Sequence, residues 1–176
     1  MKLLLLCCLM LATSSLMAQD ETTTTVPGQT SFYAELGGPG ILFSANIDRR
    51  FTKSNLGFGA RVGIGFITTE TSTYVNGNYD YDTRSVLTLP LQLNYVFGKP
   101  NSVHTFEVGA GATITGKKID VFGFDDDEPS SLYGTASFMY RRQPKDGGFS
   151  WRLGFTPIVT SGYVQPSAAV SVGYNF

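Results

Sequence analysis

Two groups of residues in this sequence could take part in chemistry on a ligand. His104 is the only histidine, and a histidine that acts as a catalytic base needs a nucleophile beside it and a group that orients it. No serine or aspartate partner can be placed near His104 from the sequence. We therefore expect His104 to be an ordinary residue at an interface, and we expect the protein not to be an enzyme and to hold no cofactor.

The second group is the acidic run Asp125–Glu128. Clustered carboxylates are suitable ligands for Ca²⁺. The run lacks the alternating ligands and the glycine of a dedicated calcium loop, so we expect a solvated loop and no metal site.

A third set consists of charged residues that occur singly among small side chains: Glu35, Asp48, Arg61, Glu107, Arg141 and Arg152. Each lies on the polar side of a stretch in which apolar and polar residues alternate. Alternation with period two places successive side chains on opposite faces of a β-strand. Charges of opposite sign in a narrow interior must pair, because an unpaired buried charge is costly. We predict a salt-bridge network that plugs the interior; a gated ion path is the alternative.

The elements that would position these charges are about eight strands separated by turn residues. Leu56–Phe66 is the clearest, because every even position is apolar and every odd one is glycine or Arg61. About eleven residues is the length that a tilted strand needs to cross a bilayer. The predicted strands are 31–36, 41–51, 56–66, 86–97, 103–114, 132–141, 149–158 and 168–176.

The connections between these strands are predicted to be of two kinds. Residues 37–40 form a tight turn by composition, whereas 68–84 and 115–131 are long polar loops. Pro90 and Pro157 lie inside predicted strands, where a missing N–H interrupts the ladder. We predict a bulge or a local break in pairing at each proline.

Side-chain size indicates which face of the sheet meets solvent or lipid. The apolar face carries many large residues, including Phe58, Leu93 and Phe155, whereas the other face is largely Gly, Ser, Thr and Asn. The interior of an eight-stranded barrel is just wide enough for its own side chains. A lipocalin-like barrel with its apolar side inward would be overfilled. We therefore predict an all-β, eight-stranded antiparallel up-and-down transmembrane β-barrel.

Aromatic residues gather at one end of these strands. Amphipathic rings favour the interface between lipid and water. With short turns and both termini assigned to the periplasm, this end is the periplasmic one. The predicted girdle consists of Phe32, Phe51, Tyr95, Phe97, Tyr140, Phe149 and Trp151, together with Tyr174 and Phe176 of the last strand.

The N-terminal segment has the pattern of a secretory signal. Lys2 precedes an apolar run that is too short to span a bilayer, and small residues lead to Ala18. We predict a signal peptide at 1–18, a disordered periplasmic lead-in at 19–29 and a barrel at 30–176. Cys7 and Cys8 are the only cysteines and leave with the signal, which excludes disulfides from the mature chain. Without Lys2 the chain has 12 basic and 14 acidic residues, and this balance gives no case for nucleic acid.

The chain resembles the small eight-stranded outer-membrane barrels of the OmpA/OmpX type. The resemblance rests on the glycine-alternating strand 56–66, on the stretch 107–111 and on the terminal 172–176. It implies the outer membrane of a Gram-negative-type envelope, with the lipid bilayer as surroundings. It also implies that the last strand is recognised by the barrel-insertion machinery, through Val170, Val172, Tyr174 and Phe176.

The resemblance specifies architecture and not a role. The sequence favours a non-enzymatic protein that contributes to envelope structure or contacts a protein partner through its long external loops. One of these loops carries the tyrosine-rich stretch Tyr74–Tyr81, whose composition is similar to that of binding surfaces. A small pore and an accessory subunit of a larger membrane complex are the alternatives.

Overall fold

The structure is a computed structural model, and it describes residues 29–75, 78–100, 102–119, 130–160 and 163–176. These residues form ten strands and one short 3₁₀ helix, and all strand pairs are antiparallel. No helix among the described residues is long and apolar enough to cross a membrane. The elements are β1 (Thr30–Gly37), η1 (Gly38–Gly40), β2 (Phe43–Arg50), β3 (Gly57–Val75), β4 (Asn78–Gly98), β5 (His104–Ile119), β6 (Ser130–Arg142), β7 (Gly148–Phe155), β8 (Ile158–Thr160), β9 (Tyr163–Gln165) and β10 (Ala168–Asn175).

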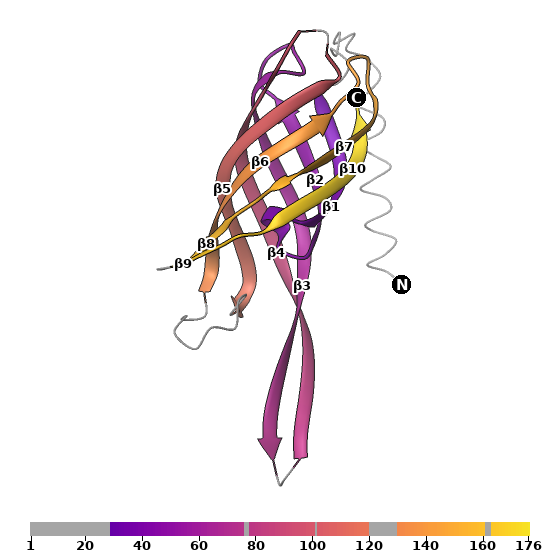
Figure 1. Cartoon of the computed structure of the whole chain (residues 1–176). Helices are drawn as coiled ribbons and strands as arrows, with labels where there is room; N and C mark the ends of the chain where they lie inside the picture. The colour runs from indigo at the N-terminus through magenta and orange to yellow at the C-terminus, as the bar shows by residue number, and fades with distance from the viewer. Residues whose placement is uncertain (1–28, 76–77, 101, 120–129, 161–162) are drawn as a thin grey trace, which may run out of the picture.

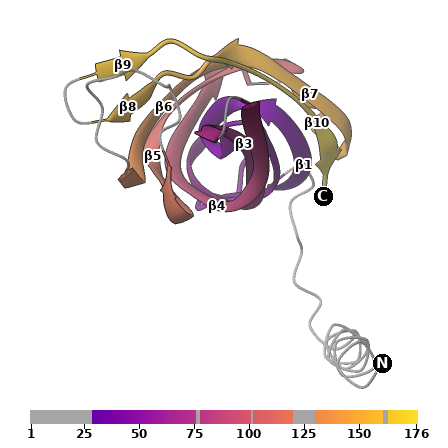
Figure 2. The same ribbon diagram turned by 90° about the horizontal axis from the view of Figure 1, so that it is seen from below.

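The strands close into a barrel (Figures 1 and 2). Sequential strands pair from β1 to β6, and β10 pairs with β1 to complete the ring. β7 and β8 both lie along β6, so they are two parts of one crossing strand, and β9 and β10 form the next. The ring therefore has eight crossing strands. The predicted eight-stranded antiparallel barrel is confirmed. Its last strand, β10, pairs with β1, where Phe32 lies opposite Tyr174 and Leu36 opposite Val170.

Proline residues explain why two of the crossing strands are split. Pro157 lies between β7 and β8, and Pro166 lies between β9 and β10. At Pro90 the chain stays in β4 and pairs with Thr113 of β5, but the ladder to β3 is interrupted between Val62 and Gly65. The breaks predicted at Pro90 and Pro157 are confirmed. The break at Pro166 was not predicted.

The prediction of a long polar loop at 68–84 is wrong, and residues 120–129, which make up most of the second predicted loop, lie outside the described residues. β3 continues to Val75 and β4 starts at Asn78, so most of residues 68–84 belong to one continuous ladder. We call residues 67–75 and 78–86 the β3–β4 ribbon. Threonine and tyrosine are common in strands, so the polarity of this segment does not distinguish a loop from a strand. β5 likewise runs to Ile119, inside the second predicted loop.

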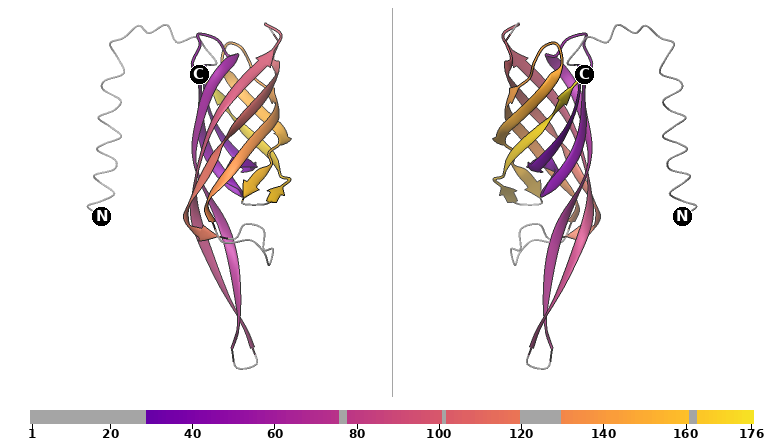
Figure 3. Two further views of the ribbon diagram at one scale, coloured as in Figure 1. Left: turned by 90° about the vertical axis from the view of Figure 1, so that its left-hand side faces the viewer. Right: turned by 90° about the vertical axis from the view of Figure 1, so that its right-hand side faces the viewer.

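The β3–β4 ribbon projects from the barrel wall on the side away from the described ends of the chain (Figures 1 and 3). Pairing of β2 with β3 stops at Phe66, and pairing of β4 with β5 stops at Thr88. Beyond these points the two strands of the ribbon pair with each other. The ribbon is thus a two-stranded arm on the rim of the barrel.

The turn predicted at 37–40 enters the barrel. Its residues Gly38, Pro39 and Gly40 form η1, and all three are buried. The η1 helix contacts β1 to β6 and also β10, which is possible only for a segment in the lumen. Gly37 and Gly38 have φ values of 70° and 71°, a conformation that glycine adopts without steric cost. These two glycines direct the chain inward.

The two faces of the barrel wall have opposite compositions. Large apolar side chains point outward, and Phe58 and Leu93 are each 63% exposed. Most buried side chains are polar or charged. This arrangement is the reverse of a water-soluble protein and is that of a barrel surrounded by lipid.

Candidate functional site

The structure brings the six charged residues singled out from the sequence together in the lumen. They come from different strands: Glu35, Asp48, Arg61, Glu107, Arg141 and Arg152 lie on β1, β2, β3, β5, β6 and β7. All six are buried. Because the strands run around the whole ring, the ion pairs between these residues cross the lumen.

Glu107 is the centre of the network. Its Oε2 lies 2.6 Å from Nη1 of Arg141 and 3.5 Å from Nη1 of Arg152, and its Oε1 lies 4.0 Å from Nη2 of Arg61. A carboxylate oxygen offers several acceptor positions and can serve more than one guanidinium. Glu107 thereby connects β5 to β3, β6 and β7.

The other two carboxylates extend the network across the barrel. Oε2 of Glu35 lies 3.3 Å from Arg61 and 3.4 Å from Arg152. Oδ2 of Asp48 accepts from Arg141 at 2.9 Å. Asp48 also pairs with Arg50, so each carboxylate meets at least two guanidinium groups, and such pairing offsets the cost of burying charge.

Several members of the network were not predicted from the sequence. Arg50 pairs with Asp48 and also donates to Oδ1 of Asn94. Tyr33 accepts from Nη1 of Arg61 at 3.0 Å, and the guanidinium carbon of Arg152 lies 3.3 Å from the centre of its ring. The signal was present, because Tyr33 and Arg50 have the same strand parity as Glu35 and Asp48.

Glycines make room for these long side chains. A Cβ atom on Gly63 would lie 2.1 Å from Oδ1 of Asn46, and one on Gly109 would lie 2.6 Å from Oγ of Ser137. Neither position accepts a larger residue without displacement of its neighbour. The glycine-rich alternation therefore has a packing role in the lumen.

The η1 helix lies in the lumen beyond the network. Thr88 donates its hydroxyl hydrogen to the Gly40 carbonyl at 3.1 Å, and Thr113 donates to the Pro39 carbonyl. These bonds fix the turn to β4 and β5. They also satisfy buried carbonyl groups that would otherwise lack a partner.

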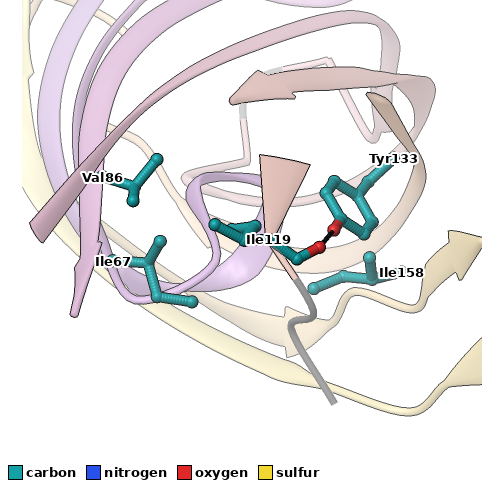
Figure 4. Close-up of a cluster of buried hydrophobic side chains, with 5 residues drawn as sticks. All are labelled: Ile67, Val86, Ile119, Tyr133 and Ile158. Carbon is teal, nitrogen blue, oxygen red and sulfur yellow. Dashed lines mark hydrogen bonds between the residues drawn. The ribbon is translucent and has the colours of Figure 1, made fainter. Parts of the chain in front are cut away.

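An apolar cluster lines the opening of the barrel opposite the termini, which we call the far mouth. Ile41, next to η1, packs against this cluster. Tyr133 donates its hydroxyl to the Ile119 carbonyl, as Figure 4 shows. The prediction of a small and polar interior did not include this cluster. Its buried members are Ile67, Val86, Ile119, Tyr133 and Ile158.

The predicted girdle residues lie on the outer wall near one rim. This terminal rim is the end where Thr30 and Phe176 pair, with Phe176 N donating to Thr30 O at 2.8 Å. Adjacent rings are in contact around part of it. Centroid distances are 4.7 Å for Phe58–Tyr95, 6.4 Å for Tyr95–Phe97, 5.9 Å for Phe97–Phe106, 5.7 Å for Phe106–Tyr140 and 5.3 Å for both Tyr140–Trp151 and Tyr174–Phe176. Phe32, Phe51 and Phe149 are exposed on the same side of the barrel wall.

The last strand presents one apolar row to the outside. Val170, Val172, Tyr174 and Phe176, the residues of the predicted assembly signal, are all exposed. Their opposite neighbours Ser171 and Asn175 are buried in the lumen. A factor that recognises this row in the unassembled chain would read alternate residues of one strand.

The remaining candidates form no site among the described residues. His104 is exposed, and its Nδ1 lies 2.5 Å from the Tyr140 hydroxyl, with the two rings stacked. In the described parts of the chain, no group of three or more His, Cys, Asp or Glu residues is placed to hold a metal ion. The acidic run 125–128 and the predicted signal at 1–18 lie outside the described residues.

Comparison with known proteins identifies the fold. No protein-family model matches the chain, and no curated protein matches it in sequence. The crystal structure of the N-terminal β-barrel domain of Pseudomonas aeruginosa OprF is similar, with a TM-score of 0.55 and 12% sequence identity. The match covers 85% of this chain and 99% of the OprF domain. The fold is therefore that of the small eight-stranded outer-membrane barrels.

Proposed function

We propose that this protein is a non-enzymatic outer-membrane barrel with a closed lumen, which acts through its outer surfaces. It contributes to envelope structure or contacts a partner through the elements at the far mouth. The observation that carries the proposal is the network of ion pairs across the lumen, together with the inward turn η1 on the far-mouth side of the network.

The network supports closure because its side chains reach across the lumen from one strand to another. Arg61, Arg141 and Arg152 reach carboxylates on other strands, and each is buried. To open a path, these pairs would have to separate in an interior of low dielectric constant, which costs several kcal/mol for each ion. A resting pore is therefore disfavoured.

The part of the lumen on the far-mouth side of the network supports the same proposal. The η1 helix is held by hydrogen bonds from Thr88 and Thr113. The apolar cluster around Ile67 and Tyr133 lies at the far mouth, and an apolar constriction resists hydration. An ion would have to pass a polar layer, a turn and an apolar layer in succession.

A role for the far mouth in binding is supported by the β3–β4 ribbon. Beyond Phe66 and Thr88, the outer edges of both its strands pair with no other strand among the described residues. Exposed strand edges offer backbone donors and acceptors to another chain. We place this end outside the cell and the terminal rim in the periplasm, because long elements lie outside and short turns inside in barrels of this kind.

A small pore is the second candidate. Oδ1 of Asn46 and Oγ1 of Thr135 are buried and have no hydrogen-bond partner among the described residues. Buried polar atoms of this kind are expected to be hydrated, and water in the lumen is a condition for ion passage.

Conductance in planar bilayers separates the two candidates. We expect the purified protein to give no sustained channels. The double variant Glu107→Ser/Arg141→Ser is the matched comparison, because it removes one negative and one positive charge, with all of their ion pairs, and leaves the net charge of the network unchanged. We expect it to show measurable conductance, which demonstrates that the assay detects an opened lumen. Sustained large channels from the unmodified protein would contradict a closed lumen.

A further inference from the structure

Two hollows lie on the outer wall of the barrel, over β3, β4 and β5. The larger, of about 410 Å³, is lined by Ala60, Val62, Leu91, Leu93 and Ala110. The other, of about 300 Å³, shares Leu93 and Ala110 with it. Together they form one furrow, which we call the Ala60–Ala110 groove. Both hollows are open on their outer side, as expected of a groove along a wall and not of an enclosed pocket.

The groove arises from the strand register. Ala60 pairs with Leu93, and Leu93 pairs with Ala110, so two methyl groups flank one long side chain. Opposite side chains on one face lie about 5 Å apart, and the short alanines leave space between the larger residues. Phe58 and Tyr95 line the second hollow and contact each other edge to face. These rings belong to the terminal rim, so the groove begins at the depth of the lipid headgroups.

Positive charge lies beside this end of the groove. Arg49 pairs directly with Ala60, and its side chain is exposed on the outer wall. Lys53 and Lys99, in the turns that flank β3 and β4, are also exposed. None of the three forms an ion pair with another of the described residues.

We propose that this face binds an anionic phospholipid, with its phosphate on Arg49 and an acyl chain in the Ala60–Ala110 groove. A guanidinium group can donate two parallel hydrogen bonds to a phosphate. Its stem lies along the apolar wall while its charged end reaches the interface. Lys53 and Lys99 add attraction for negative headgroups. The inference rests on the proposed insertion into a membrane and adds a lipid preference to it.

Arg142 provides a matched control on another part of the same rim. It is exposed, and it faces outward between His104 and Trp151 in the register of β5, β6 and β7. These neighbours are large, so Arg142 has the same charge and depth without an alanine-floored furrow. If only positive charge at the rim mattered, substitution of Arg49 and substitution of Arg142 would weaken lipid binding equally.

The test is native mass spectrometry of the folded full chain in detergent, titrated with phosphatidylglycerol or phosphatidylcholine. We expect preferential retention of one phosphatidylglycerol. Loss of one cation near the surface corresponds to about fivefold weaker binding, so Arg49→Gln should weaken retention of phosphatidylglycerol about fivefold. Arg142→Gln should change it less than twofold. Equal losses for the two variants would overturn the site.

Filling the groove tests the acyl chain. Ala60→Leu/Ala110→Leu should weaken retention of both lipids, whereas Ala45→Leu, an alanine on the outer side of β2, should not. Unchanged retention in the groove variant would overturn the proposal. The proposal would also be overturned if the groove variant changed only its oligomeric state, because the groove would then be a contact between protein chains.

Insertion is measured separately, by heat-modifiable migration after folding into phosphatidylcholine vesicles. A protein that inserts but shows no lipid preference contradicts the lipid site and leaves membrane insertion intact. A protein that folds in detergent and retains phosphatidylglycerol, but does not enter vesicles, contradicts the proposed function alone.

Discussion

At the scale of single residues, the interior depends on Glu107. The network contains three carboxylates, Glu35, Asp48 and Glu107, and four arginines, the fourth being Arg50. Glu107 lies within 4.0 Å of three of these arginines. Its loss would leave buried positive charge without compensation, and this cost is larger than the net benefit of the pairs themselves.

We predict that Glu107→Gln lowers the free energy of unfolding by about 3–5 kcal/mol, since removing one partner of a buried ion pair typically costs this amount. Urea unfolding of the protein in vesicles, followed by the fluorescence of Trp151, measures it, because Trp151 is the only tryptophan. Asp146→Asn removes an exposed carboxylate from a turn and should change the free energy by less than about 0.5 kcal/mol. A Glu107→Gln protein as stable as the unmodified one would show that the network contributes little.

Strand parity explains which residues of the interior the sequence could predict. Six charges were assigned to the lumen because each alternates with apolar neighbours. Tyr33 was not singled out because aromatic residues are also common on the outer face. Arg50 was not singled out because it follows another arginine, Arg49, at the end of a strand. The partners themselves could not be predicted. Asp48 meets Arg141 across the barrel, and that distance depends on strand tilt and stagger, which the sequence does not state.

At the scale of elements, the turn η1 depends on two glycines. A Cβ atom on Gly37 would lie 2.2 Å from the Ala168 carbonyl oxygen, and the φ of Gly37 is 70°. The backbones of β1 and β10 are held together here by the pairing of Gly37 with Ala169. A side chain at this position therefore conflicts with both the turn and the barrel wall.

We predict that Gly37→Ala lowers the free energy of unfolding by more than about 1 kcal/mol, because it combines a positive φ with a steric conflict. Thermal unfolding in detergent measures the change. Gly116→Ala is the control, since its nearest neighbour, the Leu87 carbonyl oxygen, would lie 3.6 Å from the added atom. Equal stability of Gly37→Ala and Gly116→Ala would mean that the turn can move out of the lumen without cost.

The same element shows a limit of sequence patterns. Glycine and proline at 37–40 correctly predicted a turn, yet a surface turn and an inward one have the same composition. The loop predicted at 68–84 was wrong because its composition is also compatible with strands. The polarity of these residues suggested a loop, but threonine and tyrosine are also common in strands, and cross-strand pairing is not visible in one segment alone.

At the scale of the whole molecule, the barrel is closed by its first and last strands. Phe176 N donates to Thr30 O at 2.8 Å, and the Phe176 ring lies 5.3 Å from that of Tyr174. Closure was predictable because eight alternating segments with an aromatic end leave few other arrangements. The split of the last crossing strand at Pro166 could not be predicted, because that part of the chain was assigned to no strand.

We predict that deletion of Phe176 reduces the fraction of the protein assembled into the membrane severalfold. The deletion removes a pair of the closing ladder and an exposed ring of the assembly row. Heat-modifiable migration of membrane fractions measures folding, and labelling of intact cells measures surface exposure. Phe51→Ala removes another exposed ring near the same rim and should assemble normally. Normal folding and exposure of the truncated chain would show that Phe176 is dispensable.

The β3–β4 ribbon also determines how the barrel would respond to mechanical load. From Ile67 to Val75 it extends about 26 Å, because each step between residues rises about 3.3 Å, and this length is comparable to the thickness of the hydrocarbon core of a bilayer. A molecule held at its tip would stand about this distance beyond the rim of the barrel. Ladder hydrogen bonds lie perpendicular to the strands, so a pull along the ribbon is carried by two covalent backbones directly into β3 and β4. The barrel then anchors tension in the membrane, and the ribbon sets the height at which that tension is applied.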